Sequence, residues 1–592
     1  MELKWSLKEL YESFQCNEFK DDIKKLDCYI EKINTFANDA TLNHDDEAEK
    51  LENYINTFKE FIDLVSRVGS FTSLTLSVES KNIEALKYSD IIDQKLSLLA
   101  EADTKMSKWI GTINNLDDII ETSDLLKEHR FYLKEIVRKN KYILSEGEEA
   151  IIAQMKNNGS NAWSKYKDLL ISNHKVDIEI DGEKKSLPLT VVLNMAYDND
   201  KDLRKKSYEA EIASYKAVED GVAAALNAIK GEVITVCNLR GYSSPLDMTL
   251  EESRMDRETL DAMLTAMKES LPVFRKYLRR KGELLGYKNG LPFYEMYAPV
   301  IKKDMKYDYE AGKKFVEKNF RTFSDHLGDF ARRAFDNSWI DVLPREGKVG
   351  GAFCAGLHSL GESRVMLNYG DNFGDVVTMA HELGHGFHGE CLKNESILNA
   401  DYPMPLAETA STFCETIVKK AAIKEADQDE AFAILESEIG DCTQVIVDIY
   451  SRFLFESEVF ERRKESSMTA EELKEIMLKA QKEAYGDGLD ENFLHPYMWT
   501  WKPHYYYADA NFYNFPYAFG LLFAKGLYAE YLKRGKEFTK AYEELLALTG
   551  KNMIADVTKV MNIDIHDINF WRNSLKIIEE DINKFLELSY NR

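Results

Sequence analysis

The sequence predicts a mainly α-helical protein, and three observations support this prediction. There are only 11 prolines in 592 residues, about 2% against a usual ~5%, so few positions break a helix. Leu, Lys, Glu and Ala, which favour helices, fill long uninterrupted stretches. Apolar residues also recur at helical spacing, for example at Leu260, Met263, Leu264, Met267 and Leu271, and this pattern turns one face of a helix toward a core.

The pattern divides the chain into three predicted regions. Residues 1–175 are almost wholly helical in pattern and form an amino-terminal helical lobe. Residues 176–199 form a hairpin and a boundary, because VDIEIDG, starting at Val176, alternates apolar and polar residues and ends in an Asp-Gly turn pair. Residues 200–592 resume the helical pattern and carry every chemistry-bearing motif. Within them, the glycine-rich segment from Gly347 to Tyr369 ends in RVMLNY and predicts a small sheet.

The charge and the cysteines limit the classes of function. A net charge of -25, from 102 acidic and 77 basic residues, repels phosphate backbones and anionic lipid, so we expect neither nucleic acid nor membrane as a partner. Seven scattered cysteines without a CxxC pair favour a reducing compartment. The first residues, MELKWSLKELYESF, lack the apolar run of a signal peptide, and no stretch approaches the ~20 apolar residues of a spanning helix. We therefore expect a cytoplasmic protein.

Three histidines lie within eight residues in TMAHELGHGFHGE, from Thr378 to Glu390. The surrounding VVTMAHELGHGF predicts a helix. Asp371 or Asn372 can cap its start, and Asp375 lies near the positive end of its dipole. The cluster therefore lies on a helix, where spacing decides which side chains meet.

Two of the histidines can share one metal ion. His381 and His385 are four residues apart, so their Cβ atoms lie about 5 to 6 Å apart on one helix face. Glu382 points about 100° away around the helix and can hold a water beside the ion as a general base. Two imidazoles and a neighbouring carboxylate are typical of a hydrolytic zinc site, which requires one further ligand.

The third histidine is a poor candidate for that ligand. His388 lies about 10 Å along the helix axis from His381, so we expect it to support the site from the side. The extended motif with a third histidine needs glycine at position 388 and histidine at position 391. The chain has His388 and Cys391 there, so this motif and a Cys391 thiolate are both disfavoured.

A carboxylate from the following segment is the favoured third ligand. PMPLAETASTFCETIVKKAA starts with prolines that suit a helix start, and Glu408 falls in its first turns beside small alanines that allow close helix approach. Glu390 and Glu395 are nearer in sequence but lie in a polar stretch and rank lower. Glu415, on the same predicted face as Glu408, can orient a ligand by a hydrogen bond. Two imidazoles and one carboxylate leave the ion strongly Lewis acidic.

The motifs GGAFC, RVMLNY, HELGHGFH and PLAETASTF, in this order, resemble the M3 peptidases and specifically their oligoendopeptidase F branch. LPFYEMYAP, PHYYYADANFYNFPYAFG and IDIHDINFW extend the resemblance over about residues 200–580, while the first 170 residues match only in texture. The resemblance implies a two-lobed helical shell around a deep channel, with a small sheet beside a gluzincin HExxH helix. It also implies one Zn²⁺ per chain at His381, His385 and Glu408, with Glu382 as the base.

The resemblance extends to a downstream aromatic segment whose histidine and tyrosines face the scissile carbonyl in the family. Position 504 carries the histidine, His504. Several tyrosines crowd together here, and their spacing departs from better-known M3 branches that have glycines in this loop. We favour Tyr517, then Tyr507, as the catalytic tyrosine, and assign Tyr513 to the substrate.

These observations predict a zinc-dependent oligoendopeptidase that hydrolyses internal bonds of short unfolded peptides. We expect RVMLNY to bind an extended peptide at the sheet edge, with broad sequence tolerance because backbone pairing ignores side chains. The predicted substrate contacts are Gly351, Ala352, Phe353, Met366, Asn368 and Tyr513. We expect a monomer or small homo-oligomer.

Three alternatives remain open at this point. A dipeptidyl carboxypeptidase-type exopeptidase would use the same ligands, so spacing does not separate it from an endopeptidase. A hydrolase acting on another amide is also compatible with the motif. A non-catalytic, zinc-containing peptide-binding protein is weakened by Glu382, which a structural site does not need, and by the lack of a fourth ligand at useful spacing.

Overall fold

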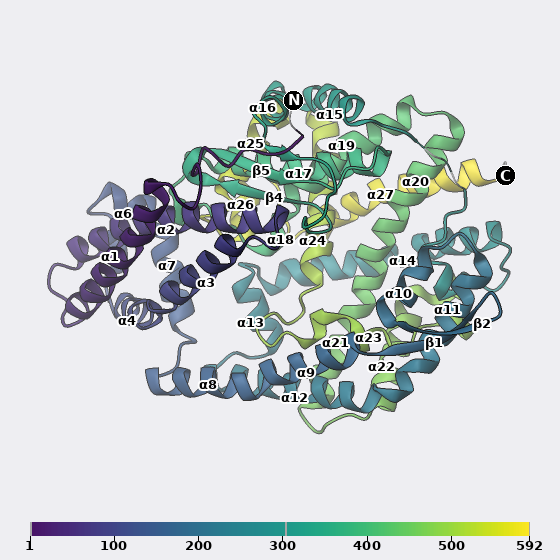
Figure 1. Cartoon of the computed structure of the whole chain (residues 1–592), viewed down its shortest axis with the longest axis horizontal. Helices are drawn as coiled ribbons and strands as arrows, with labels where there is room; N and C mark the ends of the chain where they lie inside the picture. The colour runs from purple at the N-terminus through teal and green to yellow at the C-terminus, as the bar shows by residue number, and fades with distance from the viewer. Residues whose placement is uncertain (1–2, 302, 304, 591–592) are drawn as a thin grey trace. The chain divides into compact units, whose positions relative to one another are not determined.

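The computed structural model describes residues 3–590 except residues 302 and 304. It confirms a mainly helical protein with two small sheets (Figure 1). The chain divides into two compact units, each assembled from three separate stretches. Unit 1 comprises Met1–Ile143, Met305–Lys419 and Glu530–Ile563, and unit 2 comprises Leu144–Asp304, Lys420–Ala529 and Asp564–Arg592. The three consecutive regions suggested by the sequence pattern stay a prediction.

Unit 1 is built from helices around a three-stranded sheet. Its helices are α1 (Asn17–Ala40), α2 (Glu47–Val78), α3 (Ile83–Ser97), α4 (Ala100–Gly111), α5 (Leu116–Ile120), α6 (Asp124–Glu128), α7 (Arg130–Asn140), α15 (Tyr309–Phe323), α16 (Asp325–Asp336), α17 (Phe373–Leu392), α18 (Met404–Ala407), α19 (Thr409–Glu425, within this unit to Lys419), α25 (Glu537–Leu548) and α26 (Ile554–Lys559). Its strands are β3 (Ile340–Asp341), β4 (Phe353–Leu357) and β5 (Glu362–Met366).

The predicted RVMLNY strand exists, but it is the central strand of its sheet. The strand order is β3-β5-β4, with β4 antiparallel and β3 parallel to β5. Both edges of β5 are therefore used by neighbours, and the expectation that a peptide adds to this strand is wrong. Among the described residues no strand pairs with the outer edge of β4, which is the available edge.

The sheet of unit 1 is anchored on both faces. Buried residues of the amino-terminal helices form one hydrophobic cluster that includes Leu357 of β4 and Met366 of β5. Both strands also pack against α17, the helix that carries the histidines. Burial of apolar side chains, which stabilises by about 25 cal/mol per Å², thus fixes the sheet beside the histidine cluster.

Unit 2 contains the predicted hairpin and the remaining helices. These are α8 (Glu146–Asn158), α9 (Ser160–Ser172), α10 (Leu189–Asn194), α11 (Lys201–Ser214), α12 (Glu219–Arg240), α13 (Pro245–Glu252), α14 (Arg257–Leu284), α20 (Gln428–Thr443), α21 (Ile449–Arg463), α22 (Ala470–Tyr485), α23 (Met498–Trp501), α24 (Phe515–Arg534, within this unit to Ala529) and α27 (Ile568–Ser589). Strands β1 (Lys175–Ile180) and β2 (Glu183–Pro188) pair antiparallel. Asp181 and Gly182 both have positive φ, as a tight hairpin turn requires, and the hairpin prediction is confirmed.

One helix departs from the sequence expectation about membrane spans. Within residues 3–590, with the two gaps noted, α12 alone is long and apolar enough to cross a membrane by length and composition. Half of its apolar window is buried, and Leu226 and Ile229 belong to the core of unit 2. Lys230, near its middle, forms a fully buried ion pair with Glu456 at 2.7 Å. Because its apolar side packs inside unit 2, α12 is a core helix.

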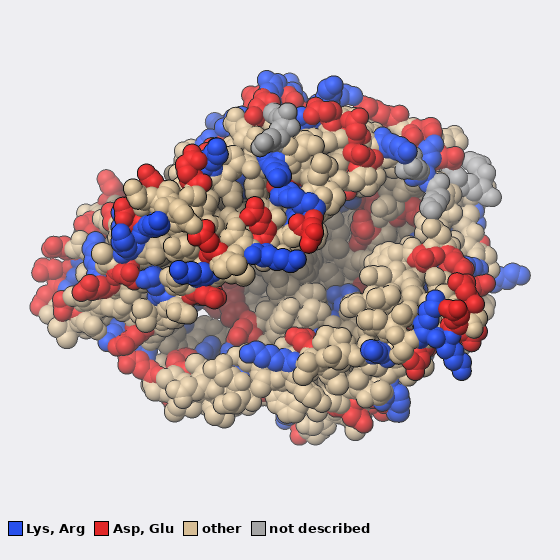
Figure 2. All heavy atoms as spheres, in the orientation of Figure 1, with Lys and Arg blue, Asp and Glu red and all other residues tan. Residues whose placement is uncertain are grey.

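The charged residues are dispersed. Figure 2 shows acidic and basic side chains interspersed over the visible face. Many of them form short-range pairs, such as Lys24 with Asp21 and Lys464 with Glu461. Exposed pairs of this kind contribute about 0 to 1 kcal/mol each, so the charge mainly keeps the surface hydrated.

Candidate metal centre

The metal centre is built on α17, whose start is fixed by a capping box. The Asn372 side chain accepts a hydrogen bond from the backbone N–H of Asp375 at 3.1 Å, and the Asp375 carboxylate accepts one from the Asn372 backbone N–H at 3.3 Å. This reciprocal pattern satisfies backbone donors that a helix start leaves free. The histidines follow two turns later, well inside the helix.

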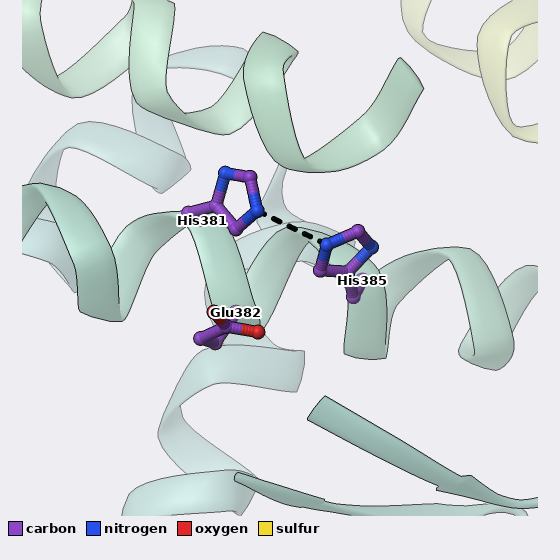
Figure 3. Close-up of side chains that lie close together, drawn as sticks. All are labelled: His381, Glu382 and His385. Carbon is purple, nitrogen blue, oxygen red and sulfur yellow. Dashed lines mark hydrogen bonds between the residues drawn. The ribbon is translucent and has the colours of Figure 1, made fainter. Parts of the chain in front are cut away.

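His381 and His385 bring their rings together, as four-residue spacing predicts. Their Nε2 atoms are 3.1 Å apart. Figure 3 shows the two rings facing each other, while the Glu382 carboxylate leaves α17 on a different side. The possible ligand atoms of these three residues lie within 4.8 Å of one another.

Glu408 completes a triangle with the two imidazoles. Its Oε2 atom lies 3.3 Å from Nε2 of His381 and 3.6 Å from Nε2 of His385. The residue is the break between α18 and α19, whereas the sequence placed it inside one continuous helix. The break frees its side chain to turn toward α17.

The triangle has the dimensions of three ligands on one zinc ion. A tetrahedral site with bonds of about 2.0 to 2.1 Å separates its ligand atoms by about 3.3 Å. The three distances between Nε2 of His381, Nε2 of His385 and Oε2 of Glu408 are 3.1, 3.3 and 3.6 Å. Two imidazole nitrogens and a carboxylate oxygen also form a donor set typical of catalytic zinc. The residues present therefore fit such an ion.

Each proposed ligand also has a hydrogen-bond partner outside the triangle. The Glu415 carboxylate lies 2.5 Å from Nδ1 of His381, and the backbone carbonyl of Ala407 contributes a hydrogen bond to His385. Ser411 donates its hydroxyl to Oε2 of Glu408 at 2.8 Å. Such outer partners fix the ring tautomer and the ligand orientation.

The close approach of α17 to the start of α19 depends on a glycine. A Cβ atom at Gly384 would lie 2.6 Å from Cα of Ser411 and 2.7 Å from the carbonyl oxygen of Ala410. Real Cβ atoms essentially never come this near to backbone. Gly384 therefore sets the distance between the histidine helix and Glu408.

Protonation in the cluster differs from residue to residue. Burial raises the pKa of Glu382 to about 7, although the charge of His381 opposes the shift. Burial and the charge of His381 lower the pKa of His385 to about 4. Burial also tends to lower the pKa of His381, but the hydrogen bond and charge of Glu415 outweigh it and raise the value. Burial and the neighbouring charges thus determine how readily each group is protonated.

A cavity of about 510 Å³ opens onto these groups, and its entire lining belongs to unit 1. It is lined by Ala352, Phe353, Cys354, Gly356, Leu357, His358, Gly361, Glu362, His381, Glu382, His385, Gly389, Leu392, Ala400, Asp401, Tyr402 and Glu408. Strand β4, with its outer edge unpaired, thus runs along the same cavity as the candidate ligands. Burial raises the pKa of Cys354, so this thiol stays protonated and is a poor metal ligand.

The predicted substrate contacts are only partly gathered around this cavity. Ala352 and Phe353 line it. Gly351 and Asn368 are not among its lining residues; instead the Asn368 amide donates to the Gly351 carbonyl at 2.8 Å. Met366 is fully buried in the hydrophobic cluster of unit 1. Its strand is central, which explains why it faces the core.

His388 has its own partners away from the triangle. It is fully buried, lies 2.8 Å from the Thr549 hydroxyl through Nε2, and stacks on Tyr402 at 4.0 Å. Burial lowers its pKa to about 3, so the ring is neutral. Since Tyr402 lines the cavity, His388 contacts the wall of the site. Burial also raises the pKa of Cys391, which disfavours a thiolate there.

The downstream aromatic segment forms a cluster within unit 2. His504 stacks on Tyr513 at 5.1 Å, and Tyr517 lies 5.9 Å from Tyr513 between ring centroids. Tyr507 packs edge-on against Tyr513 at 5.8 Å and is 39% exposed. The two tyrosines between His504 and Tyr507 are buried in the core. The four residues that the sequence analysis selected here therefore lie in one cluster: His504, Tyr507, Tyr513 and Tyr517.

Two features of the site escaped the sequence reasoning. Tyr402 lies in the polar run NADYP, which has no periodicity that would point to a cavity wall. Gly384 appeared only as a spacer of the HExxH motif, although a small residue inside a helix usually marks close packing. That rule could have identified Gly384, whereas nothing in the sequence pattern pointed to Tyr402.

The sequence matches models of known protein families. A model described as Peptidase family M3 matches residues 194–577, which is more than half of the chain. The chain belongs to peptidase family M3. A second model, described as Oligopeptidase F, matches residues 113–175 and shows the branch.

Individual M3 relatives match over most of their length. Group B oligopeptidase PepB of Streptococcus agalactiae is 25% identical over 536 residues, covering 88% of this chain and 87% of the relative. Oligopeptidase PepF of Bacillus subtilis is 23% identical over 482 residues, covering 80% and 71%.

Solved structures share the M3 fold of this chain. One from Chlamydophila abortus has a TM-score of 0.85 at 21% identity, covering 99% of this chain and 98% of that structure. Oligoendopeptidase-F from Enterococcus faecium has a TM-score of 0.71 at 18% identity, covering 97% and 99%.

Membership of the M3 family confirms the predicted family, branch and enzyme class. The chain is a metallo-oligopeptidase with an HExxH-type group at residues 381–385. The family implies a zinc-type metal site and peptide substrates.

Proposed function

We propose that this chain is a zinc-dependent oligoendopeptidase that hydrolyses internal bonds of short unfolded peptides. The observation that carries the proposal is the triangle of His381, His385 and Glu408 atoms, with the buried Glu382 carboxylate beside it. The names of its M3 relatives, oligopeptidase and oligoendopeptidase, support the substrate class.

The three triangle residues would hold one Zn²⁺ per chain. When bound, zinc supplies a Lewis acid that polarises the peptide carbonyl and brings the pKa of a water toward ~7. Glu415 keeps the His381 ring in the tautomer whose Nε2 carries a lone pair, because its carboxylate accepts a hydrogen bond from Nδ1–H. Ser411 holds the Glu408 oxygen that faces the histidines.

Glu382 is the proposed general base. It takes a proton from the attacking water and delivers it to the leaving nitrogen. Its carboxylate is buried on the cavity wall, and burial raises its pKa to about 7. A base with a pKa near the working pH both accepts and returns a proton readily.

His504 and a tyrosine, Tyr517 before Tyr507, are the proposed hydrogen-bond donors to the carbonyl oxygen as negative charge develops. Burial and the charges of Arg452 and Lys502 lower the pKa of His504 to about 4, so its ring is a neutral donor. A preorganised donor of this kind contributes about 3 to 4 kcal/mol to the transition state. Tyr513, stacked on His504, is assigned to the substrate.

Strand β4 is the proposed docking edge for the peptide backbone. Its unpaired edge and its place on the cavity wall support this assignment. Pairing through the backbone holds an extended chain without reading its side chains. Broad sequence tolerance follows, together with exclusion of peptides that are already folded.

The seven free cysteines support a cytoplasmic location for this peptidase. No pair of them is bonded in the described residues, and three are buried. Thiols in this state persist in a reducing compartment. The test is expression of a tagged chain followed by fractionation, with recovery among periplasmic or secreted proteins counting against the assignment.

The activity is tested by incubating the purified protein with a mixed peptide library and reading the products by mass spectrometry. We expect internal cuts of peptides that lack stable structure, lost after treatment with a zinc chelator and restored by added Zn²⁺. Exclusive release of carboxy-terminal dipeptides would establish an exopeptidase instead. Intact peptides under all conditions would refute the hydrolase.

The third ligand is tested separately by the variant Glu408→Ala, with Glu395→Ala as the matched control. Glu395 is an acidic residue of the same unit that pairs with Lys551. We expect Glu408→Ala to lose most bound zinc, measured by plasma mass spectrometry, while the control keeps one ion per chain. Full metal content in Glu408→Ala would reassign the ligand.

A further inference from the structure

Unit 2 contains a second cavity, and none of the proposed metal ligands or catalytic residues lines it. It measures about 390 Å³, and its entire lining belongs to unit 2. Apolar and aromatic side chains dominate the wall. Tyr197 and Tyr297 stack at 4.6 Å, and Tyr208 and Tyr294 pack at 5.4 Å between ring centroids. A wall of this kind suits a flat or bulky apolar group.

Two charged groups of the wall already have partners. Arg204 forms a buried ion pair with Glu295 at 2.6 Å. Glu211 accepts a hydrogen bond from the Tyr215 hydroxyl at 2.7 Å and faces Nε2 of His495 at 2.9 Å. Neither pair offers a free charge to a ligand.

Two donors of the same wall lack acceptors. Among the described residues, the Lys502 ammonium has no hydrogen bond or ion pair, and it lies over the Trp501 ring, 4.3 Å from the centroid. The indole N–H of Trp501 is buried and likewise has no partner. Burial and the charge of Arg452 lower the pKa of Lys502 to about 8, although the charges of Asp448 and Glu211 oppose the shift.

Both groups can only donate hydrogen bonds. The Trp501 N–H is buried without an acceptor, which is destabilising and calls for an explanation. The missing partner must accept hydrogen bonds, and the charge of Lys502 favours an anion. A carboxylate has two acceptor oxygens and meets both requirements.

We propose that this cavity binds a carboxylate attached to an aromatic or bulky apolar body. The carboxylate lies against Lys502 and the Trp501 N–H, and the body lies between the tyrosine pairs. A free aromatic acid and the carboxyl end of a peptide share this chemistry. This cavity and the metal-centre cavity have no lining residue in common.

The binding is measured by calorimetric titration of the full chain with 3-phenylpropionate and with N-acetyl-Ala-Phe. Their neutral amides serve as controls, and 3-phenylpropylamine serves as the cation. We expect saturable binding of the acids and binding of the amides and the amine weakened about tenfold or more. Preference for the free acid or for the peptide identifies the natural source. Equal binding of acid and amide would overturn the proposal.

The same titrations on chelator-treated protein separate this cavity from the metal centre. Retained binding assigns the acids to unit 2 even if the peptidase proposal fails. Loss of all binding on metal removal would place the acids on the metal and refute the site.

Variants locate the carboxylate. Lys502→Met removes the charge, and Lys288→Met is the matched control because Lys288 is an exposed lysine of unit 2 outside the cavity lining. We expect about tenfold weaker acid binding in Lys502→Met and unchanged binding in the control. If Lys502→Met fails to fold, Trp501→Phe decides the question through loss of the N–H. Wild-type affinity in a folded Lys502→Met or Trp501→Phe protein would refute the contact.

Discussion

At the scale of single residues, surroundings rather than residue type decide the chemistry. The pKa values of the three histidines on α17 are shifted in different directions. The pKa of His381 is raised by Glu415, whereas the pKa of His385 and of His388 is lowered by burial. The HExxH pattern identified the two histidines whose Nε2 atoms lie 3.1 Å apart, because four-residue spacing fixes the geometry. The protonation states could not be predicted, since they depend on partners from other elements.

The variant Glu382→Gln tests the base. We expect turnover to fall by about 10² to 10⁴-fold while bound zinc stays at one ion per chain, because the change removes a proton acceptor and leaves the triangle intact. Hydrolysis of a quenched peptide and metal analysis measure the two quantities. Glu395→Gln is the control and should keep full activity. Turnover within tenfold of the wild type would exclude Glu382 as the base.

A second residue-scale prediction concerns pH. Hydrogen bonds to Glu390 and Glu543 raise the pKa of His326 to about 9, against burial. The raised value means that the protonated ring stabilises the fold fully below about pH 6.5. That contribution is lost as the pH rises through about 9.

We expect the thermal midpoint of the wild type to fall more between pH 6 and pH 9.5 than that of His326→Gln, as recorded by calorimetry. The variant lacks the titrating ring, so its curve over this range should be flatter. Parallel curves for the two proteins would show that the ring contributes nothing.

At the scale of elements, the metal centre depends on how closely two helices meet. Gly384 on α17 lies against Ala410 and Ser411 at the start of α19. This contact sets the distance from the histidines to Glu408. A side chain at Gly384 would separate the elements and widen the triangle.

Gly384→Ala is therefore expected to lower zinc affinity at least tenfold and to lower the thermal midpoint, because overpacking costs about 1 to 3 kcal/mol. Gly389→Ala is the matched control on the same helix. A Cβ at Gly389 would lie 3.9 Å from the nearest atom, the Ser363 hydroxyl, so the helix should tolerate it. Competition with a fluorescent zinc chelator measures the affinity. Equal affinity in both variants would contradict the packing argument.

Periodicity predicted the helices and the Val176 hairpin correctly, because both depend on local patterns. It failed where pairing is non-local. RVMLNY reads as a strand, yet only strand order shows that β5 is central and that β4 offers the edge. The sequence pattern likewise placed Glu408 inside a helix, whereas the helix is interrupted at this residue. Helix propensities do not reveal a one-residue interruption of a helix when tertiary packing causes it.

At the scale of the whole molecule, the metal-centre cavity and its candidate ligands lie in unit 1, and the proposed oxyanion donors lie in unit 2. A ligand that binds only the native state stabilises it, by about 2.7 kcal/mol at a hundredfold excess over Kd. Zinc should therefore protect unit 1 selectively.

We expect added Zn²⁺ to slow hydrogen exchange in peptides from α17 and from residues 408–419, and to leave the hairpin of β1 and β2 unchanged. Exchange followed by mass spectrometry, with and without chelator, gives the result. Uniform slowing across both units would indicate global stabilisation instead. No change anywhere would mean that the triangle does not bind zinc under those conditions.

The unpaired edge of β4 has a consequence for peptide chemistry. In an extended chain, alternate backbone nitrogens face the same neighbour. A substrate paired with β4 would therefore be sensitive to N-methylation at every second amide and indifferent to it at the amides between. Peptides carrying a single methyl group, moved one position at a time past the cleaved bond, would show cleavage that switches off and on with a period of two.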